Sequence, residues 1–169
     1  MGSEAYSRES PWRRTRIVVR VPQPAAGVDW TLAVPGGHTY RPLAAFAQLV
    51  TSAAVAARVA RLAFGDGDIT FGSFPPGASQ AASLTRLYSW APSQGVAAVG
   101  TAIGGYLPEV TLQSGWTIGS VSELIDVADQ WSSVFVLVED TWVRDGSIDV
   151  DDIPSVVVEI VDAGRGSPP

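Results

Sequence analysis

The sequence predicts an all-β fold, namely an antiparallel β-sandwich or jelly roll with an extended N-terminal arm. Short runs of β-branched and aromatic residues, separated by turn residues, recur about every 10–14 residues. The 17 glycines and 12 prolines are spread over the 169 residues, which suits many short strands better than long helices. No period of about 20–50 residues repeats, so we do not expect a solenoid or a propeller.

The chain is expected to form one main domain, because 169 residues suffice for a single hydrophobic core. Residues 1–14 are predicted to be the arm, since they are rich in Ser, Glu and Arg and show no periodic apolar pattern. Residues 15–162 are the predicted β-sandwich, and residues 163–169 a tail. No apolar stretch is long enough to cross a bilayer, and residues 1–20 lack the apolar core of a signal peptide. We therefore expect a soluble protein without a membrane partner.

The first half of the chain is predicted to hold strands at 17–21, 29–34 and 69–71, with a turn at 65–68. Residues 42–64 are ambiguous, because their many alanines and the spacing of Leu43, Phe46 and Ala53 also fit a helix face. Two strands, at about 40–51 and 56–64, are favoured because Thr51-Ser52 interrupts the apolar run and the flanking segments are strands.

The second half is predicted to continue with strands at 80–90, 97–103, 106–112, 116–121, 129–144 and 155–161. The strand at 129–144 is the longest. Its valines at 134, 136 and 138 face one side, whereas Phe135, Leu137 and Glu139 face the other.

Charge is unevenly distributed along the chain. Residues 1–20 carry five Arg and two acids, residues 21–120 are balanced, and residues 121–169 carry two Arg and eleven acids. The basic arm of one copy can therefore attract the acidic part of another, although both can equally be solvated surface. Because aromatic residues and Arg dominate protein interfaces, the interface candidates are Trp12, Arg13, Arg14, Arg16 and Trp142. The chain as a whole is acidic, so no nucleic-acid partner is expected.

Few residues offer catalytic chemistry. There is no cysteine, and the only histidine, His38, follows two glycines in a predicted turn, where we expect it simply to be exposed. The acid pairs Asp66/Asp68 and Glu139/Asp140 have the residue types of a glycosidase, but turn or strand-end positions explain them. Aromatic residues that could line a sugar groove are more often core residues in a sandwich: Trp30, Trp90, Trp116 and Trp131. We expect no enzyme activity and no cofactor.

The acidic stretch at 145–152 resembles the second half of a calcium loop. Asp145, Asp149 and Asp151 are the candidate ligands, but Thr141 and Val143 stand where further acids would be needed. A solvated acidic hairpin is therefore the preferred interpretation, with a weak calcium site as the alternative.

Several short motifs between about residues 28 and 140 resemble a family of small virion proteins of tailed bacteriophages. The motifs are Trp30, Thr51-Ser52, Gln80-Ala81-Ala82-Ser83-Leu84-Thr85, Leu107-Pro108, Gly115-Trp116-Thr117-Ile118, Asp129-Gln130-Trp131 and Leu137-Val138-Glu139. The resemblance implies a jelly-roll structural subunit of the head or head–tail region, without an enzymatic role. It also implies the major capsid protein or other virion proteins as partners, and a place in the virion after assembly in the bacterial cytoplasm.

The expected function is therefore that of a capsid decoration or minor capsid protein that self-assembles and binds the shell. A homo-oligomer, with a trimer as one form, suits closed symmetry on a shell. A tail, collar or fibre component of the same virion is the alternative within this class. A carbohydrate-binding module is an alternative of another class, and a glycosidase is a third.

Overall fold

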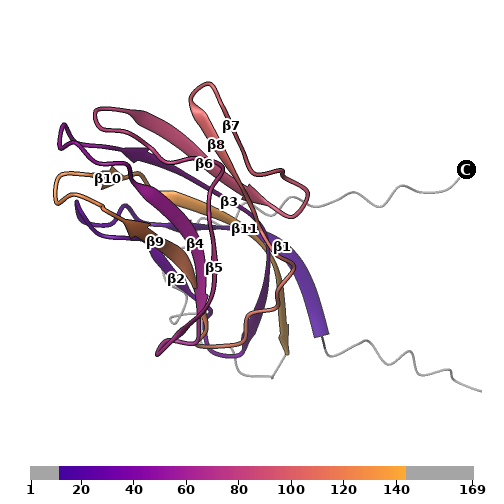
Figure 1. Cartoon of the computed structure of the whole chain (residues 1–169). Coiled ribbons are helices and arrows are strands. Elements are labelled where there is room, and N and C mark those ends of the chain that lie inside the picture. The colour runs from indigo at the N-terminus through magenta and orange to yellow at the C-terminus, as the bar shows by residue number, and fades with distance from the viewer. Residues whose placement is uncertain (1–11, 144–169) are drawn as a thin grey trace, which may run out of the picture.

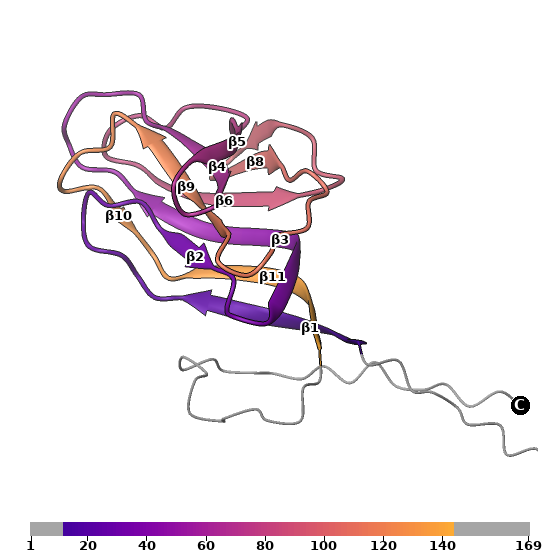
Figure 2. The same cartoon turned by 90° about the horizontal axis from the view of Figure 1, so that it is seen from below.

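The protein is a sandwich of two β-sheets, as the computed structural model shows for residues 12–143 (Figures 1 and 2). The described residues contain no helix. The larger sheet has the order β1-β11-β3-β6-β8-β7, with the short β10 also paired to β3. The smaller sheet has the order β2-β9-β4-β5. The all-β sandwich predicted from the sequence is thus confirmed.

The strands of the larger sheet are β1 (Trp12–Val21), β3 (His38–Val50), β6 (Thr85–Ala91), β7 (Ala97–Val99), β8 (Ala102–Tyr106), β10 (Gln130–Trp131) and β11 (Val134–Val143). Those of the smaller sheet are β2 (Thr31–Ala33), β4 (Val59–Gly65), β5 (Thr70–Phe74) and β9 (Thr117–Glu123). Neighbouring strands are antiparallel except for β6 and β8, which run parallel. The parallel pair departs from the purely antiparallel sheet that the sequence predicts.

The ambiguous segment at 42–64 forms strands β3 and β4, so the helical alternative is wrong. Burial in β3 follows the two-residue period of a half-buried strand. Ala45, Ala47 and Leu49 face the core, whereas Phe46 and Val50 are exposed on the other side. The many alanines favour a helix by intrinsic propensity, but pairing with β11 and β6 on either side overrides that preference.

Four strand predictions in the second half are corrected. Residues 97–103 are a hairpin of β7 and β8 that turns at Gly100, whose φ of +57° suits glycine. Residues 106–112 form no strand, and only an isolated bridge joins Leu112 to Tyr40. The predicted strand at 129–144 is divided into β10 and β11 by Ser132 and Ser133, and the one at 80–90 begins only at Thr85.

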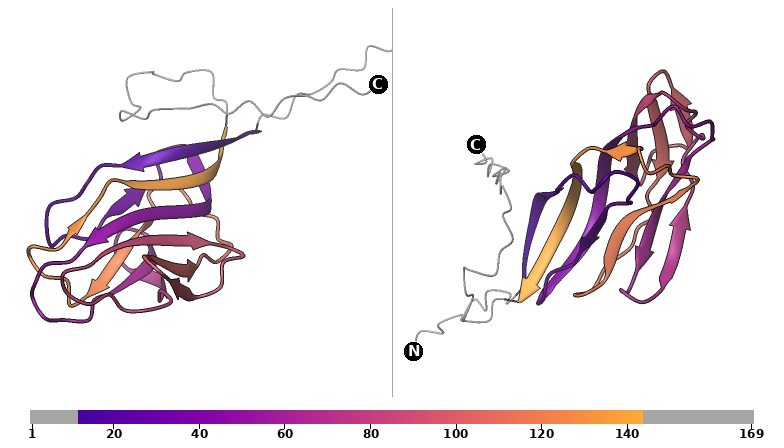
Figure 3. Two further views of the ribbon diagram at one scale, coloured as in Figure 1. Left: turned by 90° about the horizontal axis from the view of Figure 1, so that it is seen from above. Right: turned by 90° about the vertical axis from the view of Figure 1, so that its left-hand side faces the viewer.

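Strand β1 begins at Trp12, five residues earlier than predicted, and takes in the last three residues assigned to the arm. It pairs with β11 along its whole length, from Trp12 opposite Val143 to Val21 opposite Val134. The remainder of the arm, the predicted strand at 155–161 and the tail lie outside the described residues. Both ends of the described chain therefore lie at one end of the sandwich, which we call the terminal end (Figure 3).

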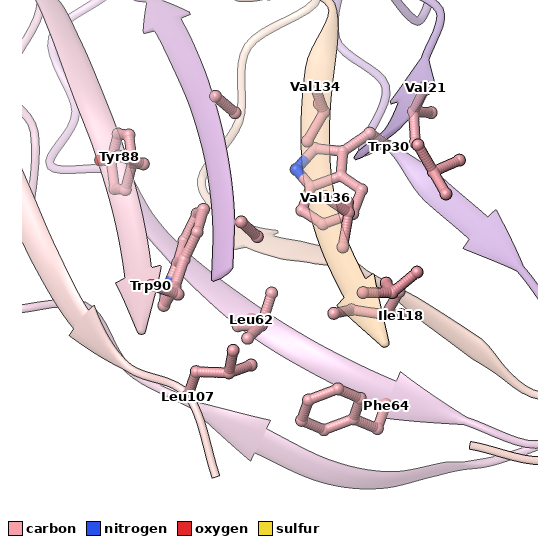
Figure 4. Close-up of a cluster of buried hydrophobic side chains, with 14 of the residues drawn as sticks. Val21, Trp30, Leu62, Phe64, Tyr88, Trp90, Leu107, Ile118, Val134 and Val136 are labelled. Carbon is pink, nitrogen blue, oxygen red and sulfur yellow. The ribbon is translucent and has the colours of Figure 1, made fainter. Parts of the chain in front are cut away.

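Between the sheets lies one cluster of buried side chains (Figure 4). Val134, Val136 and Val138 face this core, as their alternation predicts. An aromatic series runs through it, with ring centroids 6.5 Å apart for Trp30 and Trp90, 5.6 Å for Tyr88 and Trp90, and 5.4 Å for Tyr88 and Trp131. The prediction that most tryptophans fill the core is confirmed for these three.

Candidate assembly site

The end of the sandwich opposite to the terminal end is built from three connecting segments, 22–29, 51–58 and 124–129, which we call the loop end. A fully buried ion pair holds two of these segments together, because Arg58 and Asp129 belong to different ones. Arg58 Nε donates to Asp129 Oδ2 at 2.8 Å, and both side chains are 0% exposed. Arg58 Nη1 donates to the carbonyl oxygens of Ala54 and Ala56 at 2.7 and 2.9 Å.

The Asp129 carboxylate also accepts backbone hydrogen bonds, from Ser52 N–H at 2.7 Å and from Asp126 N–H at 2.8 Å. Burial acts to raise the pKa of Asp129, but the hydrogen bonds from Arg58, Asp126 and Ser52 outweigh it and hold that pKa below its usual range. The carboxylate is therefore charged at neutral pH and fixes the backbone on both sides of it. This network makes the loop end rigid.

Apolar side chains protrude from this rigid end. Val55 is 98% exposed, Val127 84% and Leu124 67%. Leu124 also has a φ of +58°, which costs a non-glycine residue about 1–3 kcal/mol. Gly27 supports the same surface, because its N–H donates to the Asp129 carbonyl and a Cβ there would lie 2.7 Å from Val127 Cα. Exposed apolar residues on fixed loops are typical of a contact surface.

A second exposed surface is the outer face of the larger sheet. Phe46 and Phe135 are cross-strand neighbours on β3 and β11, and both are exposed. Val18 on β1 and Leu87 on β6 lie exposed on the same face. Antiparallel sheets commonly present a polar face to water, so an apolar row here is a further candidate contact.

The interface candidates lie towards the terminal end, on β1 and β11. The side chains of Trp12 and Arg13 are outside the described part, although their backbones pair with Val143 and Trp142.

Arg14 is exposed, and its Nη1 lies 3.6 Å from Glu139 Oε1. Arg16 is exposed and is the backbone partner of the same Glu139. Trp142 is half-buried and stacks on His38, with ring centroids 6.1 Å apart.

His38 is the first residue of β3 and is half-buried, so the expectation of an exposed turn histidine is wrong. Its Nδ1 lies 2.9 and 3.0 Å from the two carboxylate oxygens of Asp140, which accept its hydrogen bond. Burial raises the pKa of Asp140, although the hydrogen bond from His38 opposes that shift. Burial, together with the charge of Asp140, raises the pKa of Tyr40 to about 12. In the described part of the chain, the His38 ring has no hydrogen-bond partner besides Asp140.

The carboxylates of glycosidase type have structural roles. Asp66 Oδ1 accepts from the backbone N–H groups of Asp68 and Ile69 at 3.0 and 2.9 Å, and these bonds lower its pKa. Glu139 and Asp140 are consecutive in β11, so their side chains point to opposite faces of the sheet. Glu139 and Asp140 therefore do not face a common space, as glycoside hydrolysis requires.

The aromatic residues considered for a sugar groove do not form one. Trp30, Trp90 and Trp131 are buried. Trp116 is half-buried and packs on Phe71, with ring centroids 4.9 Å apart. A binding platform for sugars needs several exposed, coplanar rings. These four tryptophans, all within residues 14–142, do not form such a platform.

The calcium candidates Asp145, Asp149 and Asp151 lie outside the described residues. Within residues 12–143, no group of three or more acidic or histidine side chains is placed to hold a metal ion. Nor does this part of the chain contain a helix of the length and apolarity that spanning a bilayer requires.

Sequence reasoning missed the loop end and the buried pair Arg58–Asp129. A signal was present, because Arg58 is the only charged residue between Arg41 and Arg61 and lies among small apolar residues. A charge in such a setting is either exposed or paired, and its partner 71 residues away is not visible in the pattern. No protein-family model matches this chain, and no curated protein matches it in sequence.

Proposed function

We propose that the chain is a non-enzymatic structural subunit of a tailed-phage virion, a capsid decoration or minor capsid protein that self-assembles and binds the shell. The assignment to a virion comes from the motif resemblance. The observation that carries the assembly role is the loop end, where Val55, Leu124 and Val127 protrude from loops fixed by the buried Arg58–Asp129 pair. Rigid loops lose little conformational entropy on binding, so such a surface is suited to a permanent contact.

A non-enzymatic role is supported by the hydrogen bonds that acidic side chains and His38 make within the fold. Among the described residues, Asp129, Asp140 and Asp66 each accept hydrogen bonds that fix local structure, and the His38 ring is held by Asp140. A general acid or base needs a side chain that faces a substrate space. In these four groups, the hydrogen bonds with neighbouring residues account for the positions of the side chains.

The two ends of the sandwich suggest a division of contacts. In this proposal the loop end contacts the shell, and the outer face and the edge of the larger sheet contact other copies. The loop end carries exposed apolar residues, whereas the β1 edge carries Arg14, Arg16 and Arg20 beside Val18. Charged edges favour specific and oriented pairing between subunits, while apolar patches supply buried area.

Mass spectrometry of purified, intact particles tests the assignment. The chain is expected among the virion proteins, and its absence from infectious particles would refute the proposal. Copy number separates the two virion positions: hundreds of copies indicate the shell, and a few to a dozen indicate the tail, collar or fibre alternative. A glycan array with no hits is expected, since Trp30, Trp90 and Trp131 are buried.

Binding to the shell can be tested separately with empty capsids. Val127→Asp is expected to weaken cosedimentation of the chain with capsids by about tenfold or more, since it places a charge in an apolar contact. Ile69→Asp is the matched control, because Ile69 is 63% exposed at the opposite end of β4. Equal binding by both variants would exclude the loop end as the contact.

A further inference from the structure

Strand β1 is a long, accessible edge of the larger sheet. Among the described strands it pairs only with β11, and it extends over ten residues from Trp12 to Val21. In Figure 2 it lies at the lower edge, beside β11. One row of backbone N–H and C=O groups therefore lacks a strand partner within residues 12–143. Natural proteins usually cover or shorten such an edge, because it can pair with another chain.

The side chains of β1 define what this edge would accept. Val19 and Val21 are buried and face the core, with Ile17 packed against it. On the outer side, Arg14, Arg16 and Arg20 alternate with the exposed Val18. Glu139 lies beside Arg14 and Arg16, so one acid faces two cations there. The edge thus favours an apolar strand that carries negative charge.

The chain itself contains a matching segment. Residues 145–162 carry six acids and no basic residue. Within this stretch, residues 155–161 have the sequence SVVVEIV, which has the β-branched composition of a strand. Valine and isoleucine would fit the apolar edge, and Glu159 would fit its arginines.

We propose that residues 155–161 of one copy add to β1 of a neighbouring copy as an antiparallel strand. This inference rests on the proposed role in self-assembly and names the contact between subunits. Main-chain hydrogen bonds would supply affinity, and side-chain alternation would fix the register. The register that pairs charges places Glu159 opposite Arg16 and Val157 opposite Val18. The same register puts Val156 and Val158 opposite Val19 and Ile17 on the core side.

The position of Val143 favours a neighbouring copy over the same subunit. Strand β11 ends at Val143, beside Trp12, whereas an antiparallel residue 155 would start opposite Arg20. Within one subunit, residues 144–154 would therefore have to run back along β1 for about 27 Å. Their full extension is about 40 Å, so this path would require them to be largely extended, whereas Asp145-Gly146-Ser147 has turn composition. A second copy imposes no such path.

Charge reversal with mixed variants tests the contact. R16E and E159R are each expected to weaken self-association of the purified full chain by about tenfold or more, measured by sedimentation velocity. An equimolar mixture of the two variants should regain association, because the carboxylate introduced on β1 of one chain can then meet the guanidinium introduced into the added strand of the other. R61E is the matched control, since it makes the same charge change on β4, where Arg61 pairs with the exposed Glu123.

The outcomes separate the possibilities. Recovery in the mixture supports the exchange between copies. Recovery only in the R16E/E159R double variant assigns the strand to its own subunit and overturns the proposal. Unchanged association of E159R, which leaves β1 intact, also overturns it, as does a wild-type chain that stays monomeric at all concentrations. Particle composition tests the virion role independently, so a monomeric virion protein would refute this contact and the self-assembly part of the proposed function, but would leave the virion role standing.

Discussion

Arg58 and Asp129 form an ion pair in which neither side chain reaches solvent, with Nε 2.8 Å from Oδ2. They come from separate loops, and the remaining guanidinium hydrogens go to the second carboxylate oxygen of Asp129 and to Ala54, Ala56 and Ser52. A buried pair with so many further hydrogen bonds offsets the cost of removing both charges from water. The pair therefore determines the shape of the loop end without adding greatly to net stability.

Removal of one partner is expected to be severe. Arg58→Ala should lower the free energy of unfolding by about 3–5 kcal/mol, because Asp129 is left buried and unpaired. Urea denaturation followed by tryptophan fluorescence measures this. Arg61→Ala is the control, and loss of its exposed pair with Glu123 should cost no more than about 1 kcal/mol. Similar losses in the two variants would contradict a structural role for the buried pair.

Acid should remove the contribution of Asp129. Its pKa is lowered in the folded state, so its stabilising effect is present above the unfolded pKa and is lost as the pH falls through the folded pKa. We expect the difference in the free energy of unfolding between wild type and Asp129→Asn to be largest at pH 7 and to decrease below about pH 4. Denaturation curves over that range measure the difference. A difference independent of pH would show that the carboxylate charge is unimportant.

The contribution of Asp140 to stability should depend on pH in the opposite direction. Burial raises its pKa in the folded state, so its favourable contribution is full below about pH 3.9 and is lost as the pH rises through the raised pKa. His38→Phe is expected to raise the pKa of Asp140 further, because the opposing hydrogen bond is removed. Carbon-13 NMR of the Asp140 carboxyl, titrated in both proteins, checks this. A lower pKa in the variant would contradict the assignment.

Tyr88→Phe should leave stability unchanged or raise it by about 1 kcal/mol. The Tyr88 hydroxyl is buried and has no hydrogen-bond partner among the described residues, and such a group costs free energy. Burial also raises the pKa of Tyr88 to about 12, as expected for an enclosed hydroxyl. Tyr106→Phe, at an exposed site, is the control. A loss above about 1 kcal/mol would instead indicate a hydroxyl bonded to an internal water.

Gly105→Ala should destabilise the core by about 1–3 kcal/mol through overpacking. A Cβ at this position would lie 2.4 Å from Cδ1 of the buried Trp90. Gly95→Ala is the matched control, because a Cβ there would meet no heavy atom within 4 Å and its φ is not left-handed. Thermal unfolding of both variants provides the comparison. An unchanged Gly105→Ala protein would mean that the β6–β8 pair can move apart.

The fold was largely predictable, since the two-residue alternation at Val134, Val136 and Val138 marks the core side without knowledge of any partner. The break between β3 and β4 was also predictable, because Thr51-Ser52 interrupts the apolar run. The parallel β6–β8 pair was not, because strand direction depends on which distant strands become neighbours. The loop end escaped prediction for the same reason. Val55 and Val127 resemble core residues in sequence, and only the fold reveals them as exposed.

The pairing of β1 with β11 has a consequence for synthesis on the ribosome. Strand β1 cannot pair until β11 has been synthesised, and β11 is translated about 120 residues later. At about 5–20 residues per second, this delay amounts to roughly 6–24 s. During that time the central strand β3 also lacks its β11 neighbour, so any nascent chain that stops short leaves two apolar strands open. Truncated products should therefore be captured by chaperones or aggregate, and only a chain translated through Val143 can close its larger sheet.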